Sequence, residues 1–267
     1  MKNRHRFAHR RFTLFLWILL LSTQNAFGGC WQKTYSTDPF IGPEIYYMKR
    51  EKEGGSQQTG VLYGVRAGYD RVQRSSCYWG IDGLWAQGPL EGKNTYACLK
   101  SEFTDANVEA RVGYTFQSKN WRCASFSPYT GLGYFWEKNH YVHPSPLHVH
   151  FDNTFSYIPI GFLSQVFLTP QCSIGLNLKF RYILEGEQKV THDSNYGALK
   201  QHYDEKLQYR IELPLTYFFC WRCHSFGCSI VPFYEVREYG HRANFPFDFL
   251  ETKLTLYGAT LKLAYLF

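Results

Sequence analysis

Apart from one short apolar run near the N-terminus, the sequence has no long apolar run. After residue 28, no window holds the roughly 18 uncharged apolar residues that a membrane-spanning helix needs, and the mean hydropathy is −0.36. This excludes a chain that crosses a membrane with several helices. Aromatic residues nevertheless make up 19% of the chain, more than a soluble domain usually carries. A barrel of strands resolves the conflict, because each strand turns only every second residue toward lipid.

Acidic residues are absent from the first 28 positions, which hold five of the 29 basic residues, Lys2, Arg4, Arg6, Arg10 and Arg11. The rest of the chain has 24 basic against 22 acidic residues, so its net charge is close to +2. A balance of this kind does not indicate a nucleic-acid partner.

The first 28 residues predict a secretory signal peptide. The apolar run 12–21 follows the basic stretch and is short for a spanning helix. Ala26 and Gly28 are the small residues expected before a cleavage point after Gly28. An alternative is lipidation at Cys30, since Gly28-Gly29-Cys30 is similar to a lipobox, with Phe27 where Leu is usual. In either case the chain leaves the cytoplasm, and residues 29–267 form the mature domain.

The mature sequence alternates apolar and polar residues, which is the period of a strand with one apolar face. In 108–117, Val108, Val112 and Phe116 share one face, and Glu109 and Arg111 share the other. The same alternation marks 61–70, 174–182, 207–217 and 257–267, and weaker versions mark 43–51, 77–87, 127–138, 153–167 and 228–239. We therefore predict an all-β fold, a transmembrane antiparallel up-and-down β-barrel of about ten strands, each with the 9–11 residues that cross a bilayer at a tilt.

The predicted connections alternate in length. Those at 71–76, 118–126, 168–171 and 220–227 are short, and those at 52–60, 88–106, 139–152, 185–204 and 240–252 are longer. Bacterial barrels have short periplasmic turns and long external loops, so the N-terminus is expected in the periplasm. A soluble β-sandwich would also alternate, but it has no need for an apolar face so rich in Tyr and Phe.

The C-terminus carries the most specific pattern. Leu261, Leu263, Tyr265 and Phe267 alternate and end on an aromatic final residue. This resembles the signal that barrel-assembly machinery recognises in outer-membrane proteins. The resemblance implies the outer membrane of a Gram-negative cell as the location, with its lipid and that machinery as partners.

A narrower resemblance rests on three features taken together. They are the signal peptide, strands of the type GVLYGVRAGYD at 60–70, and cysteines gathered at the starts of strands. In this combination the chain resembles chlamydia-type outer-membrane barrels, and the Protochlamydia outer membrane protein family in particular, whose members are regarded as candidate porins. The resemblance implies a pore and assigns no residues.

The mature chain has eight cysteines. Seven fall at the predicted periplasmic end and are candidates for disulfides: Cys30, Cys77, Cys123, Cys172, Cys220, Cys223 and Cys228. Cys98 lies alone in a predicted external loop, and a disulfide cannot bridge the roughly 25–30 Å of bilayer between the two ends. At least one of the seven is then left over, which suggests either a bond to a neighbouring envelope protein or a free thiol beside internal disulfides.

Several motifs raise the question of metal or haem chemistry. The segment 220–224, CWRCH, matches a c-type haem attachment sequence, but it occupies a short turn with no apolar pocket predicted beside it. With Cys228, its two cysteines and His224 could instead bind zinc. His148 and His150 share a strand face, with His140 and His143 in the same loop. Oxidised cysteines and a solvated loop are the simpler explanations of these patterns, so we predict no cofactor and no metal.

The sequence also predicts no catalytic residues. His192, Asp193 and Ser194 are of the right types, but they are consecutive, and neighbours on a strand point to opposite faces. The paired Asp-x-Asp and Asp-x-His arrangement of the ten-stranded outer-membrane proteases is absent. We therefore expect a barrel that is not an enzyme.

The polar face of the predicted barrel would line its lumen, where charges of both signs nearly cancel. The predicted lumen-lining residues are Arg66, Asp82, Glu109, Arg111, Lys179, Arg181, Arg210, Glu212, Glu235, Arg237 and Lys262, joined by Asp70 and Glu137. Inward glycines at positions 64, 68, 113, 131, 133, 161 and 175 remove side-chain volume and could open a narrow path.

The number of strands sets the width of such a lumen and so limits its possible functions. Eight strands leave an interior just filled by side chains, and sixteen or more leave an aqueous channel. About ten strands predict a narrow porin-like channel for ions or small solutes. The alternative is a plugged structural or adhesive barrel, disulfide-linked to the envelope.

Overall fold

The computed structural model describes residues 35–53, 55–73, 75–94, 97–117, 124–146, 149–192, 199–202, 207–240 and 251–266. The expected signal peptide at 1–28, Cys30, Cys123 and Phe267 lie outside these ranges. No helix within the described residues is long and apolar enough to cross a membrane.

The described residues form one twelve-stranded antiparallel sheet. Its strands are β1 (Tyr35–Lys52), β2 (Ser56–Gln73), β3 (Ser76–Lys93), β4 (Cys98–Thr115), β5 (Ala124–Tyr141), β6 (His150–Phe167), β7 (Cys172–Thr191), β8 (Leu199–His202), β9 (Leu207–Glu212), β10 (Leu215–Trp221), β11 (His224–Tyr239) and β12 (Thr252–Leu266). From β1 to β7 each strand pairs with the next along the chain. This is the up-and-down order that the sequence predicts.

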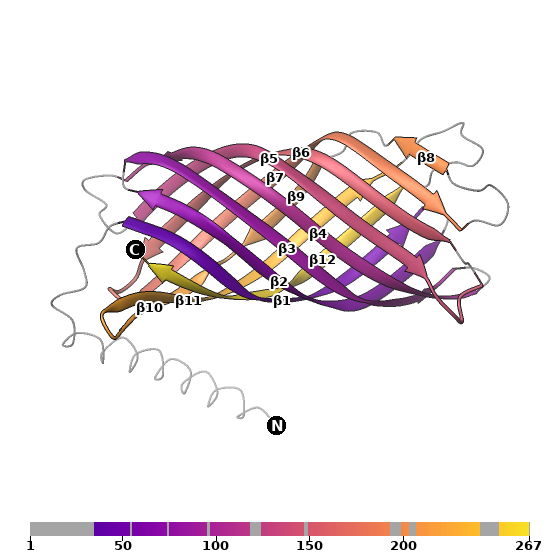
Figure 1. Cartoon of the computed structure of the whole chain (residues 1–267), viewed down its shortest axis with the longest axis horizontal. Helices are drawn as coiled ribbons and strands as arrows, with labels where there is room; N and C mark the ends of the chain where they lie inside the picture. Colours follow the sequence, from indigo (N-terminus) through magenta and orange to yellow (C-terminus); the bar gives the residue numbers. More distant parts are fainter. Residues whose placement is uncertain are drawn as a thin grey trace, which may run out of the picture.

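The sheet closes on itself to form a barrel. β12 pairs with β1, while β9 and β10 both pair with β7 on one side and with β11 on the other. β9 and β10 therefore share one place in the wall, which gives ten strand positions, and the short β8 pairs with the last part of β7. The predicted all-β barrel is confirmed. Figure 1 shows the tilted strands, with the C-terminus at one end and β8 at the opposite one; we call these the terminal end and the far end.

The structure breaks the predicted strand 207–217 into two. The interruption lies at Leu213 and Pro214, because proline has no N–H to donate to the neighbouring strand. The wall still remains bonded there. Leu213 N donates to Pro232 O at 3.0 Å, and Gly175 N donates to Pro214 O at 2.7 Å.

The strands are longer than the 9–11 residues that the sequence predicts. β1 to β6 each have 18 residues, and β7 has 20. The predicted loops 52–60 and 88–106 are mostly strand, as are parts of 139–152 and 185–204. The prediction failed because apolar alternation marks only the part of a strand that faces lipid, whereas ladder hydrogen bonds continue beyond it. Eighteen residues rise about 60 Å along a strand, so even tilted strands extend past the roughly 25 Å apolar band of such barrels.

The outer wall of the barrel is apolar and aromatic. Large apolar side chains remain exposed on nearly every strand, among them Ile41, Tyr63, Trp85, Val112 and Leu132. Aromatic pairs gather toward both ends, for example Tyr69 with Trp79 near the terminal end and Tyr134 with Trp136 nearer the far end. Exposed apolar residues with aromatic girdles are the lipid-facing surface of a transmembrane barrel.

Candidate functional site: a charged and filled lumen

Charged side chains from around the wall meet inside the barrel. We call this group the lumen network. Its members are Glu44, Arg66, Asp82, Asp105, Glu109, Arg111, Glu137, Lys179, Arg181, Arg210, Glu212, Glu235 and Arg237. Every member is at most 6% exposed. Bulk water therefore hardly reaches these groups.

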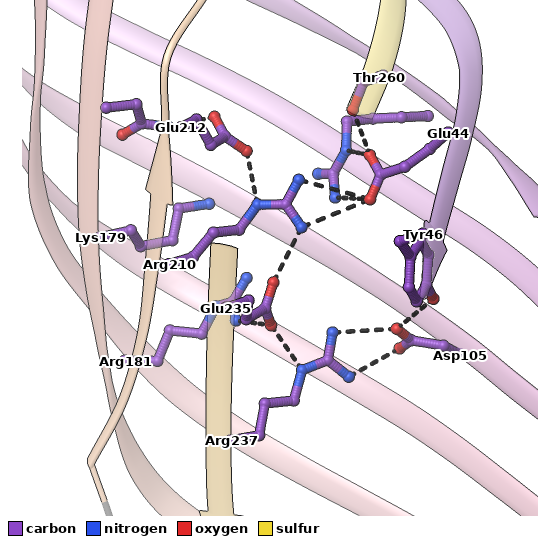
Figure 2. A network of polar contacts seen from close by, with 12 residues as sticks. Glu44, Tyr46, Asp105, Lys179, Arg181, Arg210, Glu212, Glu235, Arg237 and Thr260 are labelled. Carbon is purple, nitrogen blue, oxygen red and sulfur yellow. Dashed lines mark hydrogen bonds and ion pairs between the residues drawn. The ribbon is translucent and has the colours of Figure 1, made fainter. Parts of the chain in front are cut away.

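Arg210 on β9 is the centre of the network, as Figure 2 shows. Its Nε donates to Glu212 Oε1 at 2.6 Å, and its Nη1 donates to Glu235 Oε2 at 2.9 Å. Its Nη2 lies 3.4 Å from Glu44 Oε1, on a strand 166 residues earlier in the chain. One guanidinium thus joins three carboxylates from β1, β9 and β11, which fixes three parts of the wall relative to one another.

Arg237 forms a second centre on β11. Its Nη1 and Nη2 each donate to one oxygen of Asp105 at 3.0 Å, and Nη1 also donates to Glu137 at 2.7 Å. Asp105 accepts a further bond from Tyr46 Oη at 2.8 Å. A bidentate pair of this kind is among the stronger charge-assisted hydrogen bonds.

The network continues toward the terminal end. Arg66 bridges Glu44 and Asp82, with 3.0 Å between Arg66 Nη1 and Asp82 Oδ2. Lys179 Nζ lies 2.6 Å from Glu109 Oε1, and the other oxygen of Glu109 accepts a bond from Tyr157 at 3.0 Å. Buried charges are costly unless they are paired, and here carboxylates and basic groups neutralise one another across the lumen.

Apolar and aromatic side chains fill the space between the charges. Met48, Leu62, Phe103, Phe155 and Leu256 belong to one buried apolar cluster inside the barrel. Further rings lie against the guanidinium groups: Arg210 is 3.7 Å from the centroid of Phe233, and Arg237 is 4.3 Å from that of Phe135. The interior is a packed core with charges embedded in it.

Aromatic rings pack against three of the inward glycines, Gly68, Gly133 and Gly161. A Cβ on Gly133 would overlap the ring of Tyr157, and one on Gly161 would come within 2.9 Å of Tyr129 Oη. A Cβ on Gly68 would likewise come within 2.6 Å of Phe40. The sequence interpretation, in which missing side chains leave a path, is therefore wrong at these three positions, because rings from neighbouring strands occupy the space.

The structure places the predicted lumen residues inside the barrel. Ten of the eleven belong to the lumen network, and the eleventh, Lys262, is half-buried with its Nζ 4.4 Å from the Phe40 ring centroid. Asp70 accepts bonds from Arg111 at 3.1 Å and Tyr78 at 2.7 Å. Leu263 and Tyr265 of the predicted assembly signal lie on β12, whereas Phe267 lies outside the described residues.

Two central members of the network escaped the sequence reading. Glu44 lies on β1, where it alternates with the outward Ile41, Ile45 and Tyr47, so the period-two rule would have found it. Asp105 was assigned to the loop 88–106, although Asp105 and Asn107 continue the inward face of β4. Extending the predicted strand past its apolar segment would have revealed Asp105 as well.

The described cysteines form no disulfide, and Cys77, Cys98, Cys172, Cys223 and Cys228 carry free thiols. Cys172 and Cys228 both stand opposite Tyr217, on the two strands that flank it. Two strand spacings separate them, roughly 9–10 Å, which is beyond the reach of a disulfide. Pairing of the seven candidate cysteines with one another or with envelope proteins stays a prediction, and Cys30 and Cys123 lie outside the described residues.

The described histidines do not build a metal site. His140, His150 and His192 gather at the far end, and His140 Nε2 lies 3.0 Å from Asp152 Oδ1. Within the described part of the chain, no group of three His, Cys, Asp or Glu side chains is placed to hold a metal. His148, Asp193 and Ser194 lie outside it. The CWRCH segment forms a tight turn, in which Trp221 pairs with His224.

No family model matches the chain, and no curated protein matches it. Among solved structures, the outer membrane protease OmpT from Escherichia coli is similar with a TM-score of 0.53 at 8% identity, over 91% of this chain and 99% of that one. The translocator domain of autotransporter NalP from Neisseria meningitidis gives 0.46 at 8% identity, over 98% of both chains. The outer membrane protein OprG from Pseudomonas aeruginosa gives 0.36 at 10% identity, over 87% and 97%.

The chain therefore has the fold of an outer-membrane β-barrel. Its apolar outer wall and this fold together locate it in the outer membrane. At 8% identity the likeness to the protease extends to the fold alone. The resemblance to the Protochlamydia family and the absence of enzymatic activity stay predictions.

Proposed function

We propose that this chain is a closed outer-membrane barrel with a structural or adhesive role, the plugged alternative of the two predicted from the sequence. The observation that carries the proposal is the lumen network. Its members come from β1, β2, β3, β4, β5, β7, β9 and β11, and their side chains meet in the interior. A solute crossing the lumen would have to displace them.

Displacing the network is energetically expensive. Glu44 and Glu235 are 0% exposed, and Arg66, Arg181 and Arg210 are at most 2% exposed. Removing one partner from a buried ion pair costs about 3–5 kcal/mol, because the other charge is left without compensation. Thermal motion does not open such an interior often, so the resting barrel is expected to block ions.

One observation favours the second candidate, a narrow channel. Several buried polar atoms have no partner within the described residues, including both side-chain polar atoms of Asn139 and of Gln208, and Asp82 Oδ1. Buried polar groups of this kind usually bind ordered water. A thread of water along these atoms would give ions a path if the network rearranged.

Single-channel recording separates the two functions. The refolded protein, with its barrel state verified by heat-modifiable gel mobility, is placed in a planar bilayer. We expect no conductance steps from the wild type. Reproducible, ion-selective steps would overturn the closed barrel and favour the porin-like channel.

Two matched double variants then test whether the lumen network is what closes the lumen to ions. Arg210 and Glu235 stand opposite each other in register, as do the adjacent outward residues Ile211 and Tyr234. Arg210→Ala with Glu235→Ala removes a charge pair from the lumen, and we expect small conductance steps. Ile211→Ala with Tyr234→Ala removes two large side chains from the outer wall at the same height, and we expect no conductance steps.

The histidine and aspartate pair does not favour an enzyme. His140 and Asp152 lie on the alternate face from the buried Asn139 and Asn153, so they stand on the outside of the wall. Assembly by the barrel-assembly machinery and disulfide links to the envelope remain predictions of the sequence.

A further inference from the structure

Three lysines on the outer wall near the far end are each neutralised by a neighbouring glutamate. Lys49 lies 2.8 Å from Glu51, and Lys253 lies 2.8 Å from Glu238. Lys100 lies 3.1 Å from Glu91 in the same way. These pairs lie on β1, β3, β4, β11 and β12, along one side of the barrel.

The opposite side, on β5, β6 and β7, is different. Lys138 and Lys189 are exposed there, and neither forms an ion pair with any described residue. The register places Lys138 opposite Asp152 and Asp152 opposite Lys189, in one row across the three strands. Two lysines, separated by two strand spacings of about 5 Å each, thus flank a single carboxylate.

That carboxylate is already engaged. Asp152 Oδ1 lies 3.0 Å from His140 Nε2, in the next row toward the far end. There His140 and His150 stack with their ring centroids 4.1 Å apart, and the centroid of His192 lies 4.3 Å from that of His150. The imidazoles provide further N–H donors beside the two lysines. We call Lys138, Lys189, His140, His150 and His192 the basic patch.

The height of the basic patch on the wall is given by its neighbours. One row nearer the membrane, Trp136 stands opposite Thr154 and is 40% exposed. It packs against Tyr134, and Leu132 below it faces lipid. Aromatic residues of this kind mark the boundary of the apolar band. The basic patch therefore lies just beyond the hydrocarbon, where lipid headgroups are. The other acids nearest to it are Glu187, which is half-buried opposite Thr154, and Glu102, which is exposed opposite His140.

We propose that the basic patch binds the phosphate groups of a phosphorylated glycolipid in the outer leaflet, which is the leaflet at the far end when the N-terminus is periplasmic, as the sequence predicts. Lysine ammonium groups bind phosphate as point charges, and imidazole N–H groups supply directed hydrogen bonds. A lipid occupant follows from the position, because the patch faces sideways from the wall, directly above the apolar band, and not into the lumen. The proposal does not depend on whether the lumen is open.

The test uses native mass spectrometry on the folded full-length barrel in detergent. The probe is lipid A, titrated against the wild type, with dephosphorylated lipid A and inorganic phosphate as separate arms. We expect retention of lipid A and little retention of the dephosphorylated form. Excess inorganic phosphate should weaken lipid A binding without replacing it, because the acyl chains also contact the wall.

Two double variants decide where the lipid binds. Lys138→Ala with Lys189→Ala should weaken lipid A binding by about fivefold for each lysine. Lys49→Ala with Lys253→Ala removes the same charge from the opposite side, where the lysines are paired, and should change the binding less than twofold. Heat-modifiable mobility verifies that both variants are folded. Equal losses in the two variants, or equal retention of both forms of the lipid by the wild type, would overturn the proposal.

Discussion

The inner and outer walls of this barrel are made by alternate residues of the same strands, yet they are stabilised in different ways. On β9, Arg210 is 1% exposed and bonds three carboxylates, while Leu207, three residues earlier on the same strand, is 56% exposed on the outer wall. Outside, an apolar side chain needs only lipid around it. Inside, each charge needs a particular partner from another strand. The outer wall should therefore tolerate any apolar residue of similar size, and the inner wall should not.

The largest effect is expected from removing the central charge of the lumen network. Arg210→Met leaves Glu44, Glu212 and Glu235 without their shared partner, and we expect a loss of about 3–5 kcal/mol in the free energy of unfolding. Ile211→Met introduces the same residue one position along, on the outer wall, and should cost under about 1.5 kcal/mol. Urea unfolding in lipid vesicles measures both. Equal losses would mean that the two walls do not differ in the way proposed.

The second largest effect is expected from placing a charge on the outer wall, where the sequence has an apolar residue. Val65 is 47% exposed toward lipid and adjoins Arg66 of the lumen network. Val65→Arg should destabilise the barrel by about 2–4 kcal/mol, the cost of an arginine near the bilayer midplane. Val65→Leu is the control and should be nearly neutral. A harmless Val65→Arg would show that this position does not face the hydrocarbon.

A smaller effect is expected where a ring packs on a glycine. Gly133→Ala forces the Tyr157 ring away and weakens its bond to Glu109, at an expected cost of about 1–3 kcal/mol. At Gly227 an added Cβ would meet its nearest atom at an ordinary 3.5 Å, so Gly227→Ala serves as the control. The melting temperature of each folded variant measures the difference. A barrel unaffected by Gly133→Ala would indicate free space in the lumen and would favour the channel.

The smallest effect concerns pH at the far end. Burial, together with His140 and His192, lowers the pKa of His150 below its ordinary 6.5. The unfolded chain therefore binds this proton more readily, so the stability from neutral His150 is present above pH 6.5 and is lost as the pH falls below it. Hydrogen exchange in β6 at pH 7.5 and pH 5.5 should show slightly weaker protection at the lower pH. His150→Gln should remove most of that difference; an unchanged difference would assign it to other groups.

Local patterns were sufficient to predict much of this fold. The alternation in 61–70 and 108–117 assigned each residue to one of two walls, and ten of the eleven predicted lumen residues belong to the network. These inferences succeed because the two faces of a strand follow from backbone stereochemistry. The ends of the strands were not predictable in the same way. Beyond the lipid the outer face of β4 becomes polar while Leu99 and Phe103 are buried on its inner face, so the apolar-outside pattern ends before Asp105 although the hydrogen-bonded ladder continues.

The sequence by itself determined the class of fold, the two walls and the balance of charge between them. Only the tertiary structure decided which charges meet. Glu44 and Arg210 are 166 residues apart, and they come together because β12 closes on β1 and because the stagger of the strands brings these positions to one height. The register of β5 with β6 brings the Tyr157 ring over Gly133, and the register of β5, β6 and β7 places Lys138 and Lys189 on either side of Asp152. The physical reason is that alternation is a property of one strand, whereas register and closure are properties of the whole barrel.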